Sequence, residues 1–128
     1  MTRFNLTSEK GLLLCSAQIS GKGKPVLLKL AIDTGATRTL IPFEAALSIG
    51  INPAHSQKSI EVTTGSGTVI CPIVTVRKFS CLGVMLKKLP VVCHHLPPES
   101  PVEGLLGLDF LKAAKVVLDF ARNIIEIK

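Results

Sequence analysis

A strand-like run that ends directly in an acid limits the possible folds of this chain more than any other feature. Residues 26–32 have the composition of a strand that enters a core, and Asp33-Thr34-Gly35 follows at once. An ionised carboxylate at the buried end of a strand is costly unless it is hydrogen-bonded, and such groups are often functional. Gly35 allows a sharp turn, because glycine adopts positive φ without a Cβ penalty. The alternative is an Asx-type turn that only caps the strand.

The length and composition favour one mainly β domain. We expect residues 1–128 to form a single domain with one core, which suits a chain of 128 residues. The core must be aliphatic, because the chain has five Phe and neither Trp nor Tyr. Frequent Val, Ile and Thr favour strands. No uninterrupted apolar run approaches the roughly 18 residues of a membrane-spanning helix, so we expect no membrane partner.

The four cysteines predict reduced thiols. None belongs to a Cys-x-x-Cys pair: they are Cys15, Cys71, Cys81 and Cys93. We see no export signal and therefore expect a cytoplasmic protein with structural thiols. Cys93-His94-His95 lacks the paired spacing of a structural zinc site, and adjacent side chains on a strand point apart. We expect no metal and no cofactor.

The formal charge of +6 comes from basic residues spread along the whole chain. Adjacent pairs occur only at Arg77-Lys78 and Lys87-Lys88. A nucleic-acid binder would have a basic block or interleaved aromatic residues, and neither is present. We therefore expect a solvated surface and no nucleic-acid partner, although positive charge also favours acidic substrates.

Turn signals and apolar patterns predict the order of elements. The expected strands are 11–20, 26–32, 38–41, 73–79, 84–92, 116–120 and 123–127, and the expected helices are 43–47 and 108–114. Residues 1–10 should fray or form a short edge segment, and the proline-rich 96–101 should be a loop. Residues 12–16 faintly resemble a lipoprotein cleavage site, but their apolar stretch is shorter than a signal core of about 7–15 residues.

Residues 61–70 predict a hairpin with Gly65-Ser66-Gly67 at its tip. Glycine on both sides of Ser66 permits a tight and mobile turn. An ordinary surface hairpin would explain these glycines equally well.

Three segments together resemble the retropepsin-like aspartic proteases. The run Ala31-Ile32-Asp33-Thr34-Gly35-Ala36 resembles the catalytic motif of that family, and residues 61–70 resemble its flap hairpin. Residues 104–111 (Gly-Leu-Leu-Gly-Leu-Asp-Phe-Leu) resemble the segment that packs beside the catalytic loop. The resemblance implies a mainly β, closed barrel with a flap hairpin and one or two short helices. It also implies an aspartic endopeptidase.

The resemblance gives each matched residue a role. Asp33 would carry the proton chemistry, Thr34 would join two catalytic loops across a dimer axis, and Gly35 would leave room for the carboxylate. The flap would bind an extended peptide or protein substrate through Thr63, Thr64, Gly65, Ser66 and Gly67. Structural support would come from Leu105, Leu106 and Gly107.

The number of aspartates predicts how such an enzyme would assemble. The chain has only Asp33, Asp109 and Asp119. We expect Asp109 to cap a helix, and Asp119 lacks a following Thr-Gly. Aspartic proteases use two carboxyl groups that share one proton and activate water by general acid–base catalysis. The second carboxyl group should therefore be Asp33 of another copy, across a two-fold axis.

Departures from the viral enzymes leave the dimer interface open. Leu108-Asp109 stands where those enzymes often have Arg followed by Asn or Asp, so their dimer salt bridge does not transfer. The flap tyrosine of pepsin-like enzymes is absent, because the chain contains no Tyr. Two alternatives are a catalytically silent module of the same fold that dimerises or binds peptides, and a basic β-barrel that binds nucleic acid.

Overall fold

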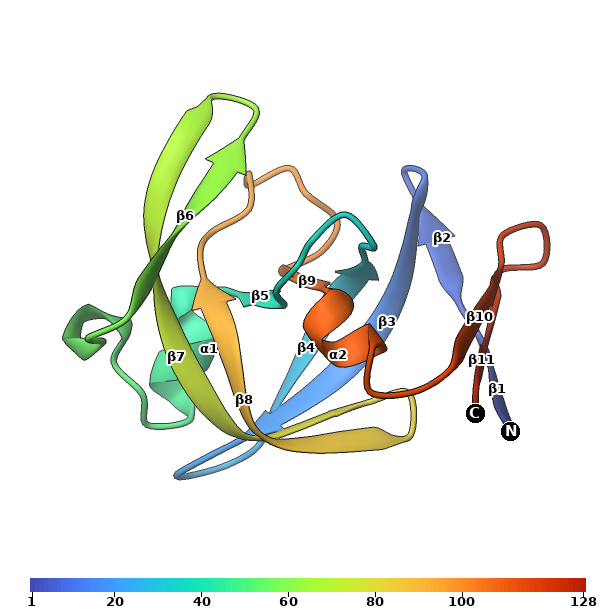
Figure 1. Cartoon of the computed structure of the whole chain (residues 1–128), viewed down its shortest axis with the longest axis horizontal. Helices are drawn as coiled ribbons and strands as arrows, with labels where there is room; N and C mark the ends of the chain where they lie inside the picture. Colours follow the sequence, from blue (N-terminus) through green and yellow to red (C-terminus); the bar gives the residue numbers. More distant parts are fainter.

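The computed structural model describes all 128 residues and has eleven strands and two short α-helices (Figure 1). The strands are β1 (Thr2–Asn5), β2 (Thr7–Glu9), β3 (Leu12–Ser20), β4 (Val26–Ile32), β5 (Leu40–Ile41), β6 (Ser59–Thr64), β7 (Gly67–Cys81), β8 (Val84–Cys93), β9 (Gly104–Leu106), β10 (Val116–Asp119) and β11 (Ile124–Ile127). The helices are α1 (Phe43–Ser48), α2 (Leu108–Leu111) and the 3₁₀ helix η1 (Pro53–His55). No helix is both long enough and apolar enough to cross a membrane.

The main sheet closes on itself. Eight strands follow the order β2-β3-β4-β9-β5-β8-β7-β6, and an additional β3–β7 pairing joins the two sides into a barrel. Most neighbours are antiparallel, but β4 pairs with β9 in parallel and β5 pairs with β8 in parallel. The predicted closed, mainly β barrel with short helices is confirmed.

The barrel encloses an aliphatic core, as the composition predicts. Its fully buried side chains include Ile19, Leu30, Ile41, Val76 and Leu106. In β4, Leu28 and Leu30 face the core while Leu27 and Lys29 are exposed, which is the alternation of a strand with one buried face. All four cysteines are buried and unpaired.

The first ten residues form two strands and do not fray. β1 pairs antiparallel with β11, with Thr2 opposite Ile127, and β10 completes a three-stranded sheet. The N-terminus and the C-terminus therefore lie side by side, at the end of the molecule away from the β6–β7 hairpin (Figure 1). The partner of β1 is more than a hundred residues away in sequence, so local patterns gave no sign of this pairing.

The predicted helix over residues 108–114 is shorter in the structure and ends at Leu111. Lys115 and Lys128 exchange backbone hydrogen bonds of 3.3 Å and 2.9 Å, which turn the chain into the terminal sheet. Between α1 and β6 the chain forms η1, where the Asn52 side chain accepts a hydrogen bond from the Ala54 N–H.

Candidate active site

Asp33 follows β4 at the point where β4 and β9 run side by side. Its backbone N–H donates to the Leu106 carbonyl oxygen at 3.0 Å, so the loop continues the pairing of the two strands. The Gly35 N–H donates to Asp33 Oδ1 at 2.8 Å, and the Ala36 N–H donates to the Asp33 carbonyl oxygen at 3.2 Å. The carboxylate is half-buried, with one oxygen oriented by the backbone.

Gly35 is required for space and not for a left-handed backbone. Its φ lies outside the positive region, so the sharp turn does not depend on that freedom of glycine. A Cβ atom on Gly35 would lie 3.1 Å from Asp33 Oδ1, in the space that the carboxylate occupies. This corrects the turn argument and agrees with the expectation that Gly35 leaves room for the carboxylate and its backbone donor.

A buried network behind the loop was missed by the sequence analysis. Thr39 is fully buried, and its hydroxyl donates to Asp109 Oδ1 at 2.7 Å and accepts from the Gly107 N–H at 3.1 Å. The Thr39 N–H also donates to both carboxylate oxygens of Asp109 at 3.0 Å. The one signal in the sequence that pointed to this network was Thr39, whose hydroxyl group stands directly before the apolar pair Leu40-Ile41.

Asp109 is not the N-cap residue that the sequence predicts, but its Oδ1 accepts a hydrogen bond from the first-turn N–H of Phe110 at 2.8 Å. The N-cap position of α2 is Gly107, which has no side-chain cap. Asp109 also ties α2 to the strand that leaves the Asp33 loop. Two backbone bonds reinforce this link, because Leu108 N–H donates to the Ala36 oxygen and Asp109 N–H donates to the Thr37 oxygen.

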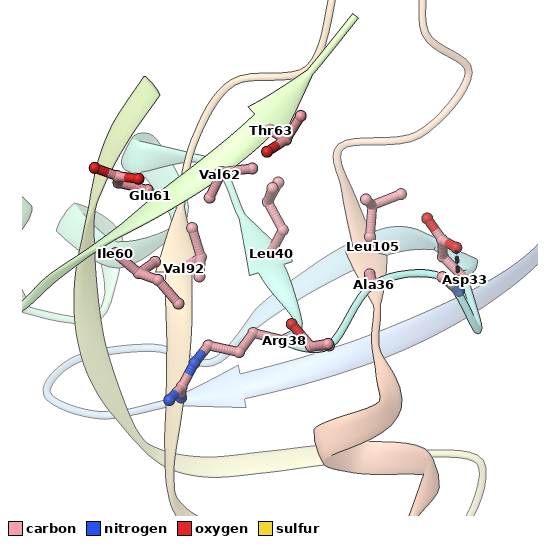
Figure 2. Close-up of a pocket in the computed structure, with 12 residues that line it drawn as sticks. Asp33, Ala36, Arg38, Leu40, Ile60, Glu61, Val62, Thr63, Val92 and Leu105 are labelled. Carbon is pink, nitrogen blue, oxygen red and sulfur yellow. Dashed lines mark hydrogen bonds between the residues drawn. The ribbon is translucent and has the colours of Figure 1, made fainter. Parts of the chain in front are cut away.

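The predicted support segment packs tightly against the loop. A Cβ atom on Gly107 would lie 2.6 Å from the Arg38 carbonyl carbon, and one on Gly104 would lie 2.0 Å from the Leu40 oxygen. Leu106 is fully buried. Leu105 faces the other way and forms part of a cavity wall beside Asp33 (Figure 2).

A cavity of about 350 Å³ lies between the Asp33 loop and the hairpin strand β6 (Figure 2). Its lining residues are Asp33, Gly35, Ala36, Thr37, Arg38, Leu40, Ile60, Glu61, Val62, Thr63, Val92 and Leu105. A second cavity of about 680 Å³ shares Leu40, Val62, Thr63 and Leu105 with the first. The two cavities are therefore neighbours beneath the hairpin, and together they are called the groove below.

The hairpin residues predicted to bind substrate are distributed unevenly along this groove. Thr63 lines both cavities, while Thr64, Gly65 and Ser66 line only the second one. Gly67 lines neither; it has a φ of 125° and begins β7. The turn itself is Gly65-Ser66, and the Thr64 hydroxyl closes it by donating to the Gly67 oxygen at 2.9 Å.

A third cavity, of about 360 Å³, is also lined by Asp33 and lies outside the groove. Thr34 lines it together with Leu12, Leu118 and Phe120, and the Phe120 side chain is 69% exposed. Thr34 is itself exposed. Asp33 therefore borders both the groove under the hairpin and an outer face of mixed polarity, where Ser8 and Asn123 lie near the exposed Phe120.

Cys93, His94 and His95 do not gather as metal ligands. His95 Nε2 lies 2.7 Å from Glu44 Oε1 on α1, while Cys93 is fully buried. Burial raises the pKa of the Cys93 thiol to about 11, and the nearby Cys71 adds to the shift. Cys93 is thus a neutral core side chain at ordinary pH.

Comparison with known proteins assigns the fold and then the family. The structure resembles a crystal structure of a retropepsin-like aspartic protease from Rickettsia conorii, with a TM-score of 0.74 and 17% sequence identity. The match covers 98% of this chain and 89% of that one, so the two share the retropepsin-like fold. Residues 16–110 match the family model described as aspartyl protease, and the chain belongs to that family. No curated protein matches it.

Proposed function

We propose that this chain is one half of a homodimeric aspartic endopeptidase, with Asp33 of each copy at the two-fold axis. The observation that carries the proposal is the position of Asp33, which has an oriented carboxylate and lines both the groove and the cavity at the outer face. A peptide in the groove would meet the carboxylate on one side. A second copy on the outer face would bring the other carboxylate to the same point.

The other two aspartates are engaged elsewhere and support a second Asp33 as the partner. Asp109 accepts three hydrogen bonds from Thr39. Asp119 accepts from the Arg122 Nε at 2.7 Å and from the Arg122 N–H at 3.0 Å, and these bonds lower the pKa of Asp119. Neither aspartate lines the groove.

The proposed reaction needs no covalent enzyme intermediate. One Asp33 carboxylate accepts a proton from a water molecule, and the oxygen of that water attacks the peptide carbonyl carbon. The other Asp33, protonated, donates a hydrogen bond to the carbonyl oxygen, and a proton then passes to the leaving nitrogen as the C–N bond breaks. The Gly35 N–H keeps Asp33 Oδ1 oriented, and β6 offers backbone groups to an extended substrate.

The outer face supports dimerisation through its composition. Phe120 is a large apolar side chain left mostly in water, and Leu12 and Leu118 extend the apolar surface beside it. The exposed Thr34 hydroxyl makes no hydrogen bond within its own chain, so it is free to bond across an axis. We place the enzyme in the cytoplasm, a proposal that the four unpaired cysteines support.

Cleavage of a varied peptide pool by wild type and by Asp33→Asn tests the proposal, from mildly acidic to neutral pH. We expect wild type to cleave as a sedimenting dimer and Asp33→Asn to lose about 10²–10⁴-fold in rate, because general acid–base catalysis contributes that much. Asp119→Asn is the matched control and should keep its activity. Equal background cleavage by wild type and Asp33→Asn would instead favour the silent binding module.

A further inference from the structure

Arg38 puts a positive charge on the wall of the groove. It follows Asp33 by five residues, and its side chain runs away from Asp33 toward Ile60 and Val92 (Figure 2). The residue is half-buried, and Leu40 and Val62 are among its apolar neighbours on the wall. A guanidinium group suits such a site, because it is more weakly hydrated than an ammonium group.

The charge of Arg38 has no partner within the chain. None of the four ion pairs includes it. Apart from Asp33, the only acid on the cavity wall is Glu61, which is exposed on β6 and makes no ion pair with Arg38. A half-buried cation that lacks a carboxylate partner attracts an incoming one more strongly than a fully solvated cation does.

The backbone beneath Arg38 is fixed on both sides. The carbonyl oxygens of Ala36 and Thr37 accept hydrogen bonds from the start of α2, and the Thr39 N–H donates to Asp109. Gly107 packs directly against the Arg38 carbonyl group. The backbone position from which the Arg38 side chain extends is therefore fixed before any ligand binds, so only the side-chain torsions must be ordered on binding.

Building on the proposed function, we propose that Arg38 forms a subsite selecting an acidic side chain, Asp or Glu, in the peptide substrate. Its guanidinium group binds a carboxylate through two parallel hydrogen bonds. Because Arg38 points away from Asp33, the selected residue is not one of the two joined by the scissile bond. A homodimer holds two such subsites, so the preference should occur on both sides of that bond at symmetric positions.

Peptides with a single Glu or Gln, placed at each position in turn, test the subsite. For wild type, we expect Glu at one symmetric pair of positions to raise kcat/KM about tenfold over Gln, as a charge-assisted hydrogen bond allows. Arg38→Gln should bring this ratio of kcat/KM values to about one. Arg38→Glu should favour peptides that carry Lys at the same positions. Arg77→Gln is the matched control, because Arg77 is exposed on β7 and lines neither cavity of the groove.

A binding experiment separates this proposal from the proposed catalysis. The experiment uses two variants that should not cleave peptides, Asp33→Asn and the double variant Asp33→Asn/Arg38→Gln. Fluorescence anisotropy then measures how tightly each variant binds the labelled Glu and Gln peptides. We expect tighter binding of the Glu peptide only where Arg38 is present, with a difference that shrinks as salt is added. This outcome would support the subsite even if wild type cleaved nothing.

Two results would overturn the proposal while leaving the protease intact. One is cleavage by wild type with equal kcat/KM for the Glu and Gln peptides at every position. The other is an equal loss of activity in Arg38→Gln and Glu61→Gln for all peptides, which would make the two residues a latch between the groove wall and β6.

Discussion

Among single side chains, Cys93 predicts a specific dependence of stability on pH. Burial raises its pKa from an ordinary value of 9.0 to about 11, so the folded protein favours the protonated thiol. The stabilisation is fully present below pH 9 and is lost as the pH rises toward 11, because only the unfolded chain then releases the proton. It amounts to no more than about 2–3 kcal/mol.

Urea unfolding of wild type and Cys93→Ala between pH 7 and pH 11 measures this effect. The free energy of unfolding should fall above pH 9 in both proteins, since burial also raises the pKa of Cys71, but the fall should be shallower in Cys93→Ala. The comparison of slopes removes the constant cost of the cavity left by the substitution. Parallel curves would show that the Cys93 thiol is not perturbed by burial.

The sequence located the catalytic-type loop but not the residues that hold it. Asp33 could be singled out because it follows an apolar strand and because its flanking residues resemble the catalytic motif of a known family. The partnership of Thr39 with Asp109 spans seventy residues, and each residue alone has a more common local role. For the same reason Asp109 was assigned to a helix cap, since capping is what an acid near a helix start usually does.

Among the elements, β9 and the start of α2 depend on glycine at close backbone contacts. Gly107→Ala would put a Cβ atom 2.6–2.9 Å from backbone atoms of Ala36 and Arg38, which cannot move aside as a side chain can. We expect a loss of about 1–3 kcal/mol in the free energy of unfolding. Cleavage activity should fall as well, because the same backbone carries Arg38 and follows Asp33.

Gly65→Ala is the matched control for this substitution. Gly65 has no positive φ, and a Cβ atom there would have no neighbour within 4 Å. Its free energy of unfolding should stay within about 0.5 kcal/mol of the wild-type value. Equal midpoints for Gly107→Ala and Gly65→Ala would contradict the close packing described for the support segment.

Elements with a strong local pattern were predicted well, and elements defined by distant partners were not. The bounds of β4 agree with the predicted strand, because its alternation and the flanking turn are both local. The predicted hairpin at 61–70 is confirmed as the paired ends of β6 and β7. For residues 1–10 the short edge segment was one of two expected outcomes, but the pairing of β1 with β11 was not foreseen, because β11 lies at the other end of the chain.

At the scale of the whole molecule, the sheet formed by the two ends of the chain needs no strand from a second copy. β1, β11 and β10 pair within a single chain, so the two ends of the chain satisfy each other without a second copy. One face that remains exposed lies beside Thr34 and carries the large apolar side chain of Phe120. A single sequence does not reveal such a face, because the interface depends on how two folded surfaces fit together.

The most direct test of the paired-Asp33 account mixes wild type and Asp33→Asn in equal amounts, unfolds them in urea, refolds them together and measures peptide cleavage. Random pairing leaves about one quarter of the dimers with two intact Asp33 residues, so activity should be about a quarter of that of the same total amount of refolded wild type. Activity of about one half would mean that each chain works alone, and would contradict catalysis by two Asp33 residues.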